Sequence, residues 1–112
     1  MPPPRKSPPA CPIERTIVVL SGRWKAMILW HLFDAPKRYS DVARLIPAVS
    51  QRALTQALRE LESDGVIHRD GTRWTVSALG KRLRPTLGAM MEWGETHRLW
   101  SATRDATRSA GD

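Results

Sequence analysis

Apolar residues return at every third or fourth position along much of the chain, and the places where this spacing stops divide it into elements. Between Pro12 and Leu20 the spacing is helical, proline suits the first turn of a helix, and Gly22 ends the run. Residues 23–33 are apolar nearly all round, which predicts a central helix buried on more than one side. The segment 34–38 that follows is read as a turn.

The next two predicted helices are short and closely spaced. Ser40 can cap a helix that runs through Ile46, and Pro47 stops it. Ser50 can cap a second helix, and Gly65 suits the left-handed conformation that ends one. The inward stripe of this second helix consists of Leu54, Leu58 and Leu61.

Two short strands are predicted next, over Val66–Arg69 and Thr72–Val76. The Asp70-Gly71 pair between them is a strong signal for a type I′ hairpin turn, which requires positive φ at both central positions. That turn would place Ile67 opposite Trp74, a favourable pairing of a β-branched with an aromatic side chain.

A long helix is predicted to close the chain. Ser77 can cap it, and Pro85 should bend or divide it. Its apolar stripe consists of Leu79, Leu83, Leu87, Met90, Trp93, Gly94 and His97.

The order of four helices, a hairpin and a last helix predicts a mainly α fold with a small β-hairpin. Two short helices joined by a tight turn and followed by a hairpin form a winged helix-turn-helix, which is nearly complete from Arg23 to Val76. The first and last helices then carry apolar stripes with little in the same chain to cover them, so we expect a homodimer built on these two terminal helices. The expected interface residues are Ile13, Ile17, Leu87, Met90, Met91, Trp93, Gly94, His97 and Trp100.

The length of 112 residues allows one domain with a modest core. Six of the nine prolines lie among the first 12 residues, so we expect residues 1–10 to form a disordered proline-rich arm. Residues 101–112 are small and polar and are expected to form a disordered tail. The folded domain should therefore comprise residues 11–100.

The formal net charge of +7 and the pI of about 10.8 favour a polyanionic partner, most often nucleic acid. The single cysteine excludes a disulfide framework within one chain, which suits a reducing cytoplasm. No apolar run approaches the roughly 20 residues needed to span a bilayer, and the first residues lack the apolar core of a signal peptide. We therefore expect a cytoplasmic protein that does not engage a membrane.

The polar side of the second short helix has the composition of a surface that reads DNA. Arginine can bridge guanine O6 and N7, glutamine can bridge adenine N6 and N7, and a helix N-terminus can hold a phosphate. A solvated helix face is the alternative interpretation of a helix taken alone. The candidate recognition residues are Ser50, Gln51, Arg52, Thr55, Gln56 and Arg59.

Further groups could position the protein on phosphates. Their alternative role is that of ordinary surface residues, and Tyr39 could instead pack against the helix it precedes. These candidates are Arg23, Lys25, Lys37, Arg38, Tyr39 and Ser40, with Arg69 and Arg73 beside the hairpin turn.

The chain resembles the HxlR-type, MarR-related winged-helix transcriptional regulators over roughly Cys11 to His97. The resemblance lies in "CPIERTIVVLSGRWKAMILWHL", "KRYSDVARLIPAVSQRALTQALRELESDGVIHR", "TVSALGKRL" and "MMEWGETH". It implies a homodimer that binds double-stranded DNA at a palindromic operator, with one recognition helix per subunit. The segment between the wing strands is usually longer in that family. Here it is "RDGTR", which argues against a deep contact of the wing with the minor groove.

Cys11 precedes the first predicted helix, where members of that family often have a cysteine and several use it to sense oxidants or electrophiles. A thiol near a helix N-terminus can be acidified, and Arg15 one turn on would add to this effect. A single thiol permits an intersubunit disulfide or an adduct with a small molecule. The alternative is an inert cysteine packed at the dimer interface.

Catalysis has no support in the sequence. The histidines His31, His68 and His97 do not form a ligand cluster by spacing, and we expect neither a metal site nor another cofactor. The leading hypothesis is a sequence-specific DNA-binding regulator, more simply a repressor than an activator, whose effector is an oxidant or another small molecule. The competing hypothesis is a winged-helix module that binds or scaffolds proteins without specific DNA binding.

Overall fold

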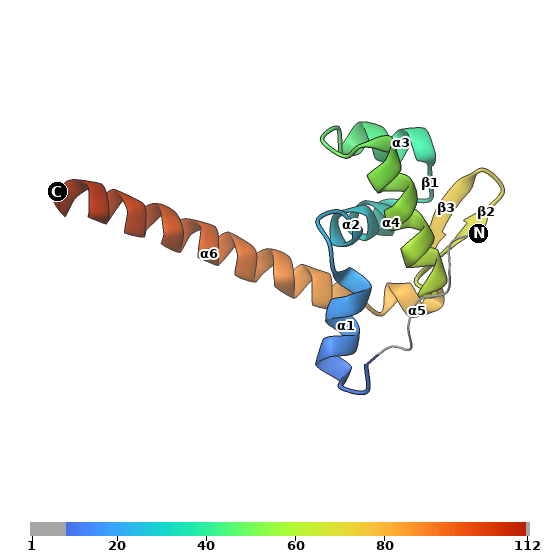
Figure 1. Cartoon of the computed structure of the whole chain (residues 1–112), viewed down its shortest axis with the longest axis horizontal. Coiled ribbons are helices and arrows are strands. Elements are labelled where there is room, and N and C mark those ends of the chain that lie inside the picture. The colour runs from blue at the N-terminus through green and yellow to red at the C-terminus, as the bar shows by residue number, and fades with distance from the viewer. Residues whose placement is uncertain (1–8, 112) are drawn as a thin grey trace. The chain divides into compact units, whose positions relative to one another are not determined.

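The computed structural model describes residues 9–111, which form two compact units, one reaching Arg82 and the other starting at Leu83. The predicted proline-rich arm lies outside the described residues except for Pro9 and Ala10. Figure 1 shows the order of the elements along the chain. The first unit contains α1 (Pro12–Leu20), α2 (Lys25–Asp34), β1 (Lys37–Arg38), α3 (Tyr39–Leu45), α4 (Gln51–Ser63), β2 (Ile67–Asp70), β3 (Arg73–Val76) and α5 (Ala78–Lys81). The second contains α6 (Arg84–Gly111).

The helix α2 is the centre of the first unit. It contacts α1, α3, α4 and β3, and Ile28 and Leu29, which point in different directions from the helix axis, have no exposed surface. This confirms the expectation of a central helix buried on more than one side, because a helix with apolar residues all round is stable only where several neighbours cover it.

The helices α3 and α4 form the predicted helix-turn-helix (Figure 1). The prediction for Ser50 is confirmed, since its hydroxyl accepts a hydrogen bond of 3.0 Å from the amide of Ala53. The prediction for Ser40 as a cap is wrong, because α3 begins at Tyr39 and its N-cap residue is Arg38, so Ser40 lies within the helix. The carboxylate of Asp41 accepts a hydrogen bond of 3.0 Å from the amide of Arg38, and this interaction holds the start of α3.

The sheet has three antiparallel strands in the order β1-β3-β2, one more than predicted. The missed strand β1 contains just Lys37 and Arg38, which pair with Trp74 and Arg73 of β3. Two residues are too few to show an alternation of apolar and polar positions. Their extended conformation depends on β3, which lies far away in the sequence.

The predicted register of the wing is also wrong, because Ile67 pairs with Val76 and Trp74 pairs with Arg69. The cause lies in the turn. Gly71 has a φ of 63°, whereas no described residue other than glycine has a positive φ, so Asp70 does not enter the type I′ turn. The two-residue loop is instead Gly71-Thr72, with glycine at the first position as in a type II′ turn.

Ser77 caps α5, and α5 packs closely on the sheet. The hydroxyl of Ser77 accepts a hydrogen bond of 3.0 Å from the amide of Gly80. A Cβ atom at Gly80 would lie against the carbonyl oxygen of Val66 and 2.7 Å from Cγ1 of Val76. This close approach is possible because glycine has no side chain.

The predicted last helix is divided before Pro85, into α5 and α6. Within the second unit, α6 continues through Gly111, whereas the sequence analysis placed residues 101–112 in a disordered tail. Alanine and arginine, both good helix formers, account for this continuation, since no glycine or proline occurs between residues 101 and 110. Within residues 9–111, no helix combines the length and the hydropathy required to cross a bilayer.

Candidate nucleic-acid interface

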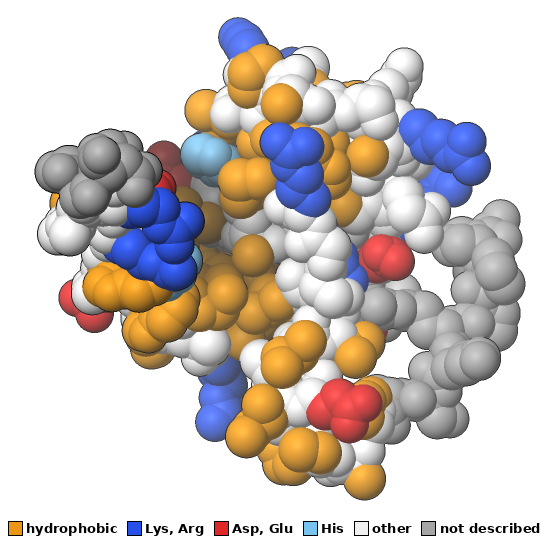
Figure 2. Space-filling model, turned by 60° about the vertical axis from the view of Figure 1, so that its left-hand side comes forward, with side chains coloured by type: hydrophobic (Ala, Val, Ile, Leu, Met, Phe, Trp, Pro, Cys, Tyr) orange, Lys and Arg blue, Asp and Glu red, His pale blue; other side chains and the backbone are white. Residues whose placement is uncertain are grey.

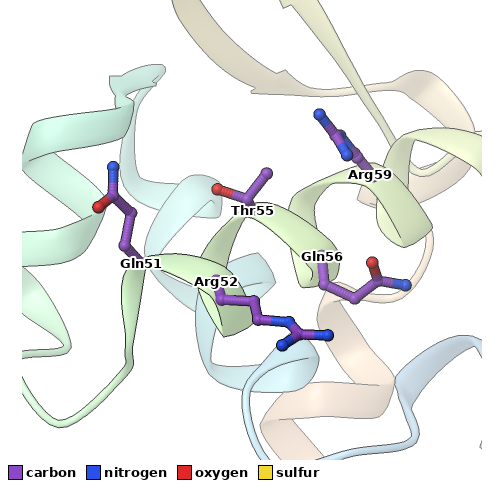
Figure 3. A pocket seen from close by; sticks show the side chains of 5 residues that line it. All are labelled: Gln51, Arg52, Thr55, Gln56 and Arg59. Atoms are coloured by element: carbon purple, nitrogen blue, oxygen red, sulfur yellow. The ribbon is translucent and has the colours of Figure 1, made fainter. Parts of the chain in front are cut away.

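The helix α4 is sharply divided into an apolar and a polar side. Leu54, Leu58 and Leu61 are at most 2% exposed, and they anchor α4 in the core. The opposite side bears side chains that line one surface pocket, as Figure 3 shows. These are Gln51, Arg52, Gln56 and Arg59, all exposed, and the half-buried Thr55. The structure thus brings together five of the six residues that the sequence proposes for recognition.

The N-terminus of α4 adds an electrostatic feature to this side. The first turn contains no acidic side chain, and the capping residue Ser50 is exposed. The free amides at a helix N-terminus carry partial positive charge, which suits a phosphate oxygen. The end of α4 and its outward side therefore offer donors for both the backbone and the bases of a nucleic acid.

Tyr39 ties the start of α3 to α4. Its hydroxyl donates a hydrogen bond of 3.0 Å to the carbonyl oxygen of Gln51 and lies 3.3 Å from Oγ1 of Thr55. The sequence analysis considered Tyr39 as a phosphate contact or as a residue packed on its own helix. In the structure its hydroxyl is directed to α4 instead, where it fixes the spacing of the two helices.

Most of the other candidate cations are at the surface. Arg23, Arg38, Arg69 and Arg73 are exposed, as is Ser40. The guanidinium of Arg23 lies 4.4 Å from the centre of the Trp24 ring, and that of Arg69 lies 5.0 Å from the centre of the Trp74 ring. Such stacking restricts an arginine while leaving its donors accessible.

Lys25 and Lys37 differ from these surface cations. Lys37 has a side chain that is 15% exposed, with its nitrogen 3.9 Å from the carboxylate of Asp34. Lys25 is 4% exposed, and its ammonium donates a hydrogen bond of 3.1 Å to the carbonyl oxygen of Val18. The prediction of Lys25 as a phosphate contact is therefore wrong, because its ammonium group is buried and bonded within the protein. The partner Glu60, which lies 3.7 Å away in α4, gave no signal in the sequence.

Asp41 lies on α3 among several arginines. The hydrogen bond from the amide of Arg38 lowers the pKa of its carboxyl group, and the charge of Arg44 at 2.7 Å lowers it further. A carboxylate near a DNA-binding surface would repel phosphate, but here the charges of Arg44, Arg38 and Arg73 partly neutralise it. The sequence analysis did not single out this residue.

Cys11 is exposed and stands at the N-cap of α1. The backbone amides of Glu14, first, and of Ile13, at the start of α1, lower the pKa of its thiol. Arg15, which the sequence analysis expected to acidify the thiol, instead donates a hydrogen bond of 3.4 Å to the carbonyl oxygen of Pro9. The start of the helix, rather than a neighbouring charge, is therefore what favours the thiolate.

Comparison with known proteins decides the family. The family of HxlR-like helix-turn-helix proteins matches residues 19–101, which include α2 to α5 and most of α6. This chain belongs to the HxlR family. It is thus a transcriptional regulator of the helix-turn-helix type, a class that binds DNA, and the winged-helix fold predicted from the sequence is confirmed.

This HxlR-family chain is similar to a regulator known by its sequence and to two proteins of known structure. The chain is 38% identical to the HTH-type transcriptional regulator YdeP of Bacillus subtilis, over 91% of this chain and 85% of that protein. It superposes on the redox regulator HypR in its oxidised form with a TM-score of 0.72 at 38% identity, over 77% of this chain and 96% of HypR. Quinone-bound YodB of Bacillus subtilis gives a TM-score of 0.71 at 31% identity, over 77% of this chain and 99% of YodB.

Proposed function

We propose that this HxlR-family protein is a homodimeric repressor that binds a palindromic operator in double-stranded DNA through α4. The observation that carries the proposal is the polar side of α4, where arginine and glutamine side chains surround one pocket while three leucines hold the helix in the core. In helix-turn-helix dimers, two recognition helices enter successive major grooves about 34–36 Å apart. We then expect Arg52, Gln56 and Arg59 to contact the base edges, whereas Gln51 and Ser50 lie nearer the start of the helix.

The exposed apolar surface of the terminal helices supports the homodimer. In α1, Ile13 is 73% and Ile17 is 60% exposed. In α6, Met90, Met91, Trp93 and Trp100 are each about half exposed or more, and the His97 ring is stacked on Trp93 with centroids 5.2 Å apart. Figure 2 shows many hydrophobic side chains at the molecular surface. Large exposed apolar patches are typical of protein interfaces.

One predicted interface residue does not fit this pattern. Leu87 is 5% exposed in the single chain, so it has little surface left for a partner. Gly94, in contrast, lies on α6 where an added Cβ would meet nothing within 4 Å. A second copy of the chain is therefore expected to cover the part of α6 that follows Leu87.

The flanking cations would hold the phosphate backbone on either side of α4. Arg38 and Ser40 lie at the start of α3, Arg23 lies before α2, and Arg69 and Arg73 belong to the wing strands or their ends. Lys37 is half-buried and would contribute through its charge more than by direct contact. Contacts of this kind set the register of the protein on the duplex without reading its sequence.

We also propose that Cys11 makes the regulator responsive to oxidants or electrophiles. Its exposure and lowered pKa favour the reactive thiolate. HypR is named a redox regulator, and YodB is known in a quinone-bound form. Because the chain has one cysteine, an oxidant would take two electrons and two protons from the Cys11 thiols of two subunits as a disulfide forms. An electrophile would instead accept an electron pair from one thiolate, so that a covalent bond forms between it and the sulfur of Cys11.

Selection of bound duplexes from a random pool tests the proposal, with the full-length protein at two salt concentrations. We expect an enriched inverted repeat and an affinity that falls steeply with salt, because bound phosphates release counterions. A reporter placed behind the selected site should then be expressed less when the protein is present. If no duplex is enriched over random sequence, the protein-binding or scaffold role replaces the DNA-binding role.

A further inference from the structure

The hydroxyl group of Thr55 donates its one proton to a hydrogen bond within the protein. Tyr39 has one hydroxyl proton, and it donates that proton to the carbonyl oxygen of Gln51, which can only accept. The contact of 3.3 Å between Tyr39 and Oγ1 of Thr55 then requires Thr55 to be the donor. The three groups thus form a short chain of hydrogen bonds that runs from Thr55 through Tyr39 to Gln51.

This chain of hydrogen bonds fixes the side-chain rotation of Thr55. With Oγ1 held toward Tyr39, the methyl group has one staggered position available. Figure 3 shows the hydroxyl of Thr55 on the side of Gln51 and its methyl group pointing away from Gln51. Thr55 is half-buried, whereas the four other residues that line the pocket are exposed.

The five side chains that line the pocket therefore differ in their ability to form hydrogen bonds with a ligand. Gln51, Arg52, Gln56 and Arg59 end in amide or guanidinium groups, which make hydrogen bonds. Thr55 alone among the five ends in a methyl group, and its hydroxyl has no proton left for a ligand. A duplex bound to this side of α4 would thus meet a small apolar contact between polar ones.

We propose that Thr55 is a specificity-determining residue whose methyl group contacts the 5-methyl group of a thymine in the major groove, and this rests on the DNA-binding function proposed above. Thymine is the DNA base that presents a methyl group in that groove, and apolar contact with a threonine methyl is an established way to read it. Cytosine at the same position offers an amino donor and no methyl group. Tyr39 acts as the positioning residue that keeps the methyl group of Thr55 outward.

Replacement of thymine by uracil tests this contact, because it removes the methyl group and leaves the base-pairing unchanged. Each thymine of the selected operator is replaced by uracil in turn, symmetrically in both half-sites, and the dissociation constant is measured. We expect one position at which the wild-type protein binds the uracil duplex about 3- to 10-fold more weakly. If no thymine in the operator shows this loss, the proposal is wrong even though specific DNA binding stands.

Two substitutions at Thr55 separate its methyl group from its hydroxyl. Thr55→Ser keeps the hydroxyl bonded to Tyr39 and removes the methyl, so it should bind the thymine and uracil duplexes equally. Thr55→Val keeps a methyl group and removes the hydroxyl, so it should still prefer thymine. Preference for thymine that persists in Thr55→Ser, or is lost in Thr55→Val, would overturn the proposal.

Two further variants complete the experiment. Thr103→Ser in α6 is the control, because it also removes a methyl group from a helical threonine, but one that lies outside the pocket. Thr103 is exposed, and its hydroxyl donates a hydrogen bond of 3.0 Å to the carbonyl oxygen of Leu99. This variant should keep the full preference for thymine. Tyr39→Phe frees the hydroxyl of Thr55 and should reduce the thymine-to-uracil ratio, a result that a purely structural role of Tyr39 would not give. An unchanged ratio in Tyr39→Phe would contradict the positioning role.

Discussion

The ammonium nitrogen of Lys25 lies 3.7 Å from a carboxylate oxygen of Glu60, so α2 and α4, the proposed recognition helix, are joined by an ion pair that is largely shielded from solvent. The side chain of Lys25 is 5% exposed and that of Glu60 is 29% exposed. The same ammonium donates to the carbonyl oxygen of Val18 near the end of α1. One cation thus connects α1 with α2 and with α4, the helix that bears the proposed DNA-binding surface.

Replacement of Lys25 by methionine keeps most of the side-chain volume and removes the charge. We expect the free energy of unfolding to fall by about 1–3 kcal/mol, because Glu60 loses its partner and the carbonyl of Val18 loses this donor. Urea denaturation followed by tryptophan fluorescence measures the change. Lys81→Met, at an exposed position, is the control and should stay within about 0.5 kcal/mol of the wild type. An unchanged midpoint for Lys25→Met would show that the pair contributes nothing.

The close contact of Gly80 with the sheet predicts opposite results at two glycines. Gly80→Ala should destabilise the fold by about 2 kcal/mol or more, because its Cβ would press on the backbone of Val66 and on Val76. At a protein concentration low enough to keep the chain monomeric, Gly88→Ala should stabilise it by about 0.5–1 kcal/mol, since that position is helical and an added Cβ meets nothing within 4 Å. Thermal unfolding of both variants distinguishes packing from helix propensity. Equal shifts would contradict the predicted close approach.

The lowered pKa of Asp41 predicts a dependence of stability on pH. A carboxyl group whose folded pKa lies below its unfolded value of about 3.9 stabilises the protein above that value, and this stabilisation is lost as the pH falls through the folded pKa. The melting temperatures of wild type and Asp41→Asn should therefore differ near neutral pH and converge below about pH 4. Asp105→Asn in α6 is the control. A gap that stays constant from pH 7 to pH 3 would show that Asp41 does not contribute through its charge.

Arg52 and Arg59 can read bases or hold phosphate, and the two roles give different results on substitution by alanine. A base reader should lose about 1–3 kcal/mol of discrimination at one operator position, whereas a phosphate contact should weaken binding to all duplexes and reduce the salt slope by about one. Binding of each variant to single-base operator variants at several salt concentrations assigns the role. Arg108→Ala in α6 removes the same charge and should change neither quantity. If Arg52→Ala and Arg59→Ala both bind as the wild type does, α4 is not the recognition helix.

The lowered pKa of Cys11 predicts a thiol that reacts at lower pH than an ordinary cysteine. The rate of alkylation by iodoacetamide should rise at lower pH in the folded protein than in the same protein in urea, because the amides of Glu14 and Ile13 stabilise the thiolate when α1 is formed.

Diamide should give a crosslinked dimer on a non-reducing gel and alter DNA binding, and Cys11→Ser should abolish both effects. Coinciding alkylation profiles and unchanged DNA binding after diamide would make Cys11 an inert residue.

The sequence predicted the elements whose signals are local. The cap at Ser50, the helix end at Gly65 and the leucine stripe of α4 depend on residues within one or two turns of each other, and the structure confirms all three. The outward side of α4 follows directly from that stripe, because side chains opposite a buried row must face away from the core. The residues of the candidate recognition surface could therefore be predicted from the sequence alone.

The tertiary structure decided the features whose partners are distant in the chain. The two-residue strand β1 exists because β3 pairs with it, and Lys25 is buried because Val18 and Glu60 satisfy its charge. Tyr39 is directed to α4 because the turn brings Gln51 and Thr55 to its hydroxyl. From the sequence alone, a lysine or tyrosine at the start of a helix is predicted to be a surface residue, whereas its real environment depends on which segments the fold places beside it. Periodicity specifies which side of an element is buried, whereas hydrogen bonds and ion pairs require the positions of both partners in space.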